Sequence, residues 1–127
     1  MHIIDLAPDL EAGSHRIENT AVFQTLSPLE GFRGYRLAAS AVYLMQQCGK
    51  PPGEICFSRD IYWPLALGAH IPYRLVYGNL RTFLSAVSSR LPDVLTVIMG
   101  ASCPKPPSPQ SFLIALYRRM EEGQPYI

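Results

Sequence analysis

Residues 71–99, IPYRLVYGNLRTFLSAVSSRLPDVLTVIM, decide the expected fold. Apolar residues in the first part of this stretch recur at helical spacing, which predicts a helix from Ile71-Pro72 to about Ser89. The positions expected to face the core are Leu75, Val76, Leu80, Phe83, Leu84 and Val87. Leu91-Pro92-Asp93 ends the helix, and the β-branched, apolar run 94–99 predicts a strand.

A shorter helix is expected immediately before this stretch. Ser58 can cap a helix from Arg59 to Leu67, which Gly68 closes and Pro64 disturbs. A short helix, a tight turn and a longer helix form a helix-turn-helix candidate. The strand and the loop that follow would add a wing. We therefore expect an α+β fold that is mostly helical, with a winged-helix-like helix-turn-helix core, a small β-sheet and a C-terminal helix.

The flanking segments complete a single domain of 127 residues. Ser27-Pro28-Leu29-Glu30 resembles a capping box and predicts a helix from about Pro28 to Gln47, which opens the body 27–127. Residues 1–26 are expected to form a less regular N-terminal arm. Further short strands could form at 3–6 and 54–57, and residues 21–23 are another short apolar piece. Four prolines keep the loop 103–109 out of helix and central strand, and a last helix should run from Pro109 or Gln110 to Glu122.

The helix 72–89 offers the most specific candidate for a binding surface. Its residues opposite the apolar positions are Arg74, Gly78, Arg81, Ser85 and Ser88, and Tyr77 flanks them. Arginine can contact guanine or phosphate, and small residues allow a helix to approach DNA closely. Arg59 and Lys105 would add phosphate contacts. The alternative is a solvated face that carries two arginines without a binding role.

Part of this region resembles a known DNA-binding family. Residues 51–61, PPGEICFSRDI, followed by Gly68 and by residues 72–78, PYRLVYG, are similar to the winged-helix half of alkylguanine DNA alkyltransferases and alkyltransferase-like proteins. Tyr77 interrupts the family's Arg-x-Val-Gly core, and the reactive Pro-Cys-His-Arg motif is absent. The resemblance implies a DNA-binding scaffold without transferase activity. The order of elements is also similar to small winged-helix-like domains of bacterial and prophage proteins.

Other classes of site have little support in the sequence. Three cysteines without close pairing give no zinc motif, and we expect no metal, no cofactor and no catalytic residues. An enzyme that uses Cys103 and His70 is the third hypothesis, and it requires the two side chains to meet. Trp63 is expected in the core, or alternatively at the surface as a binding anchor.

Charge and hydropathy indicate where the protein works. The net charge is +1, but residues 1–30 carry a net −4 and residues 31–127 a net +5. No apolar run reaches the ~20 residues of a membrane helix, and the N-terminus does not read as a secretory signal. We therefore expect a cytoplasmic protein of bacterial or phage type.

Two functions remain as hypotheses. The first is a small DNA-binding or regulatory module that uses Arg74, Tyr77, Arg81, Lys105 and Arg59. The alternative is a protein–protein interaction module, an inhibitor or adaptor of a larger complex. A homodimer through the C-terminal helix belongs to this second hypothesis, because Phe112, Leu113, Leu116, Tyr117 and Met120 give that helix an apolar face.

Overall fold

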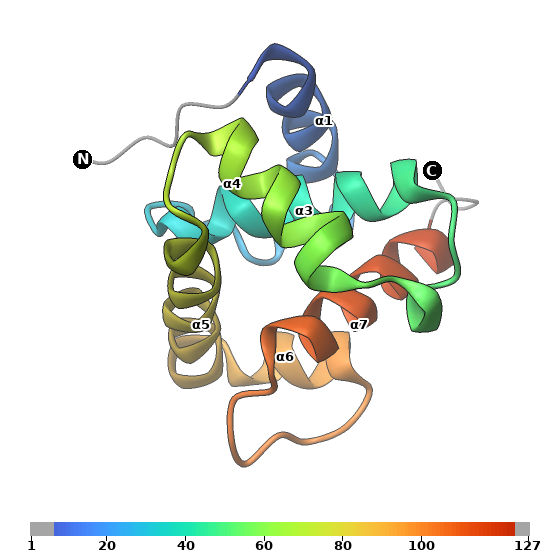
Figure 1. Cartoon of the computed structure of the whole chain (residues 1–127). Coiled ribbons are helices and arrows are strands. Elements are labelled where there is room, and N and C mark those ends of the chain that lie inside the picture. The colour runs from blue at the N-terminus through green and yellow to red at the C-terminus, as the bar shows by residue number, and fades with distance from the viewer. Residues whose placement is uncertain (1–6, 124–127) are drawn as a thin grey trace.

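A computed structural model of the chain describes residues 7–123, and every regular element within them is a helix (Figure 1). The α-helices are α1 Pro8–Glu18, α2 Ala21–Gln24, α3 Arg33–Cys48, α4 Trp63–Ala69, α5 Tyr73–Arg90, α6 Pro92–Met99 and α7 Pro109–Gly123. The helical turns η1 Ser27–Leu29, η2 Pro52–Glu54 and η3 Phe57–Tyr62 connect them. The expected α+β fold with a small sheet is wrong: residues 7–123 contain no strand, and the fold is all-α.

Helix α3 forms the centre of the core, in the middle of Figure 1. It packs against α1, α5 and α7, and its residues 37–42 are all fully buried. The expected helix from Pro28 is divided in two. Phe32 has extended backbone angles and caps α3, so η1 and α3 are separate elements joined through Gly31. An edge-to-face series of aromatic rings, Tyr35 to Phe83 and Phe83 to Phe112, links α3 to α5 and α7.

Glycines allow two helices to lie close to α3. A Cβ at Gly13 of α1 would collide with the ring of Tyr43. A Cβ at Gly34 of α3 would collide with Phe83 and with the backbone carbonyl oxygen of Asn79, both in α5. The absence of a side chain at these two positions therefore sets the distance between α3 and its two main neighbours.

The N-terminal arm is more regular than the sequence indicated. Residues 8–18 form α1, whose Pro8 stands in the first turn and whose Leu10 and Ile17 are buried. Residues 21–23, the short apolar piece of the arm, begin α2, because the Thr20 hydroxyl accepts a hydrogen bond from the Phe23 backbone N–H. The possible strand at residues 3–6 lies outside the described residues.

The run 94–99 is a helix instead of the expected strand. Pro92 and Asp93 occupy the first turn of α6, and Gly100 ends it with a left-handed backbone (φ 79°). Leu95 and Ile98, three residues apart, are buried, whereas Val97 is 69% exposed. The residues 54–57 also form no strand: η2 ends at Glu54, and Phe57 begins η3. Without these strands the expected wing does not form.

The helix-turn-helix order itself is present. The expected helix 59–67 appears as η3 followed by α4, with Pro64 just after the junction, where its missing N–H costs least. His70 adopts a left-handed conformation (φ 56°) and ends α4, and α5 begins at Tyr73. Leu75, expected in the core, is 36% exposed.

Among the described residues no single helix is long and apolar enough to cross a membrane. Helices α5 and α6 reach that length and hydropathy only when they are taken together, and a 111° bend separates them.

Substitution of Gly34 tests the close approach of α3 and α5. Gly34→Ala should lower the free energy of unfolding by about 1–3 kcal/mol, because backbone atoms cannot move away from the added methyl group. Gly78→Ala is the matched control, since a Cβ there meets no atom within 4 Å and alanine should gain up to about 1 kcal/mol of helix propensity. Urea unfolding followed by circular dichroism measures both. Equal stability of Gly34→Ala and wild type would contradict this packing.

Candidate functional site

The outward face of α5 carries the predicted binding residues. Arg74, Gly78, Arg81 and Ser85 are exposed, and Ser88 is half-buried. Tyr77 is 42% exposed. Val76, Leu80, Phe83, Leu84 and Val87 hold the opposite face in the core, as the spacing predicted. The helix is thus fixed by one face and presents the other, with two arginines, to solvent.

Three of the five predicted site residues line one hollow, which we call the basic hollow. Its lining residues are Tyr77, Arg81, Leu84 and Ser85 from α5 and the loop residues Lys105, Pro106, Pro107, Ser108 and Pro109. Its volume is about 490 Å³. Two of these side chains are cationic, and no carboxylate among the described residues lines it. The basic hollow therefore combines charge and hydroxyl groups suited to an anion.

Local interactions hold the side chains on both sides of the basic hollow, on α5 and in the loop before α7. The Arg81 guanidinium lies 6.0 Å from the centre of the Tyr77 ring, one helical turn away. The Ser108 hydroxyl accepts a hydrogen bond from the Ser111 backbone N–H (3.2 Å) and so caps α7. The prolines at 106, 107 and 109 restrict the loop between Lys105 and this cap.

A second hollow adjoins the first at Tyr77, and we call it the tyrosine hollow. Its lining residues are Ile55, Cys56, Phe57, Ser58, Tyr62, Tyr73, Tyr77 and Gln110, around about 540 Å³. Burial, followed by the proximity of Tyr77 and Tyr73, raises the pKa of Tyr62 to about 12, so its hydroxyl stays protonated. The tyrosine hollow is aromatic, and again no carboxylate of the described part lines it.

The structure does not bring the other two predicted residues into either hollow. Arg74 lies on the exposed face of α5, one residue from Tyr73, but lines neither space. Arg59 is held by a neighbouring carboxylate: its Nε lies 3.0 Å from Oδ1 of Asp60. Asp60 also binds Lys50 at 3.1 Å. Arg59 and Lys50 thus share one carboxylate, and Arg59, whose side chain is 69% exposed, lines neither hollow.

Asp60 organises the start of η3. Beyond its bonds to Arg59 and Lys50, it accepts a hydrogen bond from the Cys56 backbone N–H (3.1 Å). The hydrogen bonds from Arg59 and Lys50 hold the pKa of Asp60 well below its ordinary value. The backbone N–H of Arg59 and the Ser58 hydroxyl lower the pKa of the exposed Cys56 thiol.

The residues of the enzyme hypothesis do not pair. His70 is the exposed residue that ends α4. The Cys103 thiol donates to the Ala101 carbonyl oxygen (3.5 Å) in the loop after α6. No hydrogen bond joins these two described residues, so this structure offers no nucleophile–base pair of that kind.

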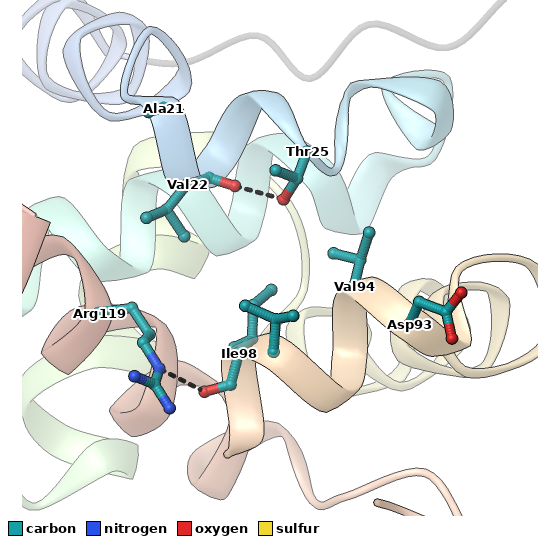
Figure 2. Close-up of a pocket in the computed structure, with 8 residues that line it drawn as sticks. Ala21, Val22, Thr25, Asp93, Val94, Ile98 and Arg119 are labelled. Atoms are coloured by element: carbon teal, nitrogen blue, oxygen red, sulfur yellow. Dashed lines mark hydrogen bonds between the residues drawn. The ribbon is translucent and has the colours of Figure 1, made fainter. Parts of the chain in front are cut away.

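Sequence reasoning missed an apolar groove between α2, α6 and α7 (Figure 2). Its lining residues are Ala21, Val22, Thr25, Asp93, Val94, Val97, Ile98 and Arg119, around about 390 Å³. Figure 2 shows Asp93 and Arg119 at opposite ends, with Val94 and Ile98 between them. The Arg119 Nε donates to the Ile98 carbonyl oxygen (3.2 Å) and joins α7 to α6. The sequence does not indicate this groove, because the run 94–99 favours a strand; Pro92-Asp93 and Gly100 are the signals that favour a helix.

No protein-family model, no curated protein and no solved structure matches the chain. The resemblance to winged-helix alkyltransferases also loses its structural basis, because the described residues form no wing.

The contribution of Asp60 to stability can be tested by measuring how stability depends on pH. Its folded-state pKa is depressed, so its stabilising contribution is present above the unfolded value of 3.8 and is lost as the pH falls below that value. Asp60→Asn should lower the melting temperature at neutral pH, and the difference from wild type should shrink on acidification. Thermal unfolding followed by circular dichroism measures this. Asp9→Asn, an exposed carboxylate in α1, is the control; an unchanged gap at low pH would contradict the assignment.

Proposed function

We propose that the protein binds DNA through the outward face of α5 and the basic hollow. The observation that carries the proposal is the meeting of Tyr77, Arg81 and Lys105, which come from a helix and a distant loop. Arginine and lysine held together without an intervening carboxylate attract phosphate, which supplies most of the affinity of DNA-binding proteins. We further propose that the protein works in the cytoplasm, in a bacterial or phage context, as its sequence led us to expect.

The arrangement of α5 supports this function. Arg74 and Arg81 lie on the same exposed face, about 10 Å apart along the helix axis. Gly78 lies between them with open space around it, so a phosphate chain meets no bulky side chain there. The surface offers three cations, Arg74, Arg81 and Lys105, because Arg59 is ion-paired with Asp60 and lines neither hollow. Binding should therefore be weak and sensitive to salt.

The number of cations sets the expected salt dependence. Three phosphate contacts with duplex DNA would give about a 40-fold loss of affinity between 50 and 200 mM salt. Arg74→Ala/Arg81→Ala should weaken binding and lower the slope of log K against log salt by about 1.8. Fluorescence anisotropy of a labelled DNA measures both quantities.

The control for this variant removes the same charge elsewhere. Arg16→Ala/Arg118→Ala, with exposed arginines on α1 and α7, should leave the slope unchanged. An equal loss in the two double variants would mean that net charge, and not this surface, attracts DNA. If wild type shows no binding to any DNA at low ionic strength, the proposed function is wrong.

A second candidate function is protein–protein interaction at the apolar groove. Exposed apolar surface of this kind marks contact sites, and Val97 is 69% exposed at its edge. The partner that fits is a second copy of this chain, because two such grooves that face each other under two-fold symmetry would cover each other's apolar residues. The apolar face of α7, expected to make such a contact, is buried in the protein's own core at Phe112, Leu113 and Leu116.

Self-association is tested by placing a charge in the groove. Val97→Glu should convert a dimer into a monomer, measured by sedimentation equilibrium over a range of concentrations, because a buried unpaired carboxylate is costly. Leu67→Glu is the matched control, since Leu67 is 63% exposed on α4, away from the groove residues. A wild-type protein that stays monomeric at every concentration would exclude this partner.

A further inference from the structure

Three aromatic residues on α4 and α5 form a row beside the basic hollow, and we call it the aromatic row: Trp63, Tyr73 and Tyr77. Trp63 is 54% exposed and Tyr77 is 42% exposed. The core position expected for Trp63 is therefore wrong. The rings of Trp63 and Tyr73 lie 5.5 Å apart between centroids and are tilted by 44°. Large aromatic rings are seldom left in water, so this row favours a binding surface.

The aromatic row is continuous with the cations. Tyr73 and Tyr77 both line the tyrosine hollow, and Tyr77 also lines the basic hollow together with Arg81 and Lys105. Tyr73, Tyr77 and Arg81 are spaced four residues apart on α5, a line of about 12 Å. The surface thus runs from Trp63 to Lys105, with rings at one end and charges at the other.

We propose that the nucleic acid held on this surface is single-stranded DNA, an inference that rests on the proposed DNA-binding function. Unpaired bases stack on Trp63 and Tyr77, and the phosphates lie against Arg81 and Lys105. Stacking on aromatic rings with cations along the backbone is the usual means of binding single strands. In a duplex the base faces are covered by neighbouring bases, so these rings would gain no contact.

The sequence provides its own probe of this contact. Trp63 is the sole tryptophan of the chain, so its fluorescence reports directly on the aromatic row. An unlabelled oligothymidylate added to wild type should quench this emission, whereas a blunt duplex should quench it much less. Anisotropy of the same DNAs, labelled, should give an affinity about 10-fold higher for the single strand, as stacking on one or two rings supplies.

Variants that remove or keep an aromatic ring distinguish a loss of base stacking from a loss of folding. Tyr77→Ala should weaken single-strand binding about 10-fold, and Tyr77→Phe should keep it, because the ring face does the stacking. Trp63→Phe should likewise keep binding in the anisotropy assay, and Trp63→Ala should lose it. Leu67→Ala removes an exposed apolar side chain one turn along α4 and should have no effect. Circular dichroism verifies that each variant is folded.

The possible results separate the inference of single-strand binding from the proposed function of DNA binding. Absence of binding to both DNAs at low salt overturns the proposed function and this inference together. Binding of the duplex at least as tight as that of the single strand, with unchanged Trp63 emission, overturns only the inference. Much tighter binding of an oligouridylate of equal length would overturn the assignment to DNA and make the 2′-hydroxyl part of recognition.

Discussion

The burial of α3 on all its sides is the constraint on which the rest of the structure depends. Residues 37–42 of this helix have no exposed surface, and most of them are small. Small side chains, with Gly13 and Gly34 at the two crossings, let α1 and α5 pack closely on α3. Close packing removes apolar surface from water without leaving voids, and both effects stabilise the fold. Each of the other α-helices packs against α3 or against a helix that contacts α3.

The candidate surface follows from that packing. Helix α5 must turn its apolar side to α3, so the side with Arg74 and Arg81 faces solvent. The ring of Phe83 in turn contacts Phe112 and fixes the start of α7 beside α5. The proline-containing loop enters α7 at Ser108, which brings Lys105 to the basic hollow. The meeting of two cations distant in sequence is thus a consequence of the aromatic core.

The sequence predicted the long helices and the short helix at 59–67, but it did not predict α1, α2 or α6. The helix 72–89 and the last helix were found because their apolar spacing extends over several turns. The run 94–99 favours a strand in the sequence because its six β-branched and apolar residues are compatible with a strand as well as with a helix. Leu95 and Ile98, three residues apart, pack on the core, and this packing favours the helix. The exposure of Trp63 depends on tertiary position, which no local pattern encodes. The ion pair of Arg59 with Asp60 joins neighbouring residues, so the sequence itself carries that signal.

The absence of a wing among residues 7–123 bears on which nucleic acid the proposed surface would suit. A wing would place a second set of phosphate contacts beside the recognition helix and suit a duplex. Here the space beside α5 is taken by the restricted loop that carries Lys105 on one side and by exposed rings at Trp63 and Tyr73 on the other. Few cations give little affinity for a rigid duplex, but each ring can add a stacked base when the strand is free to bend. The chemistry of this surface therefore favours a flexible strand over a double helix.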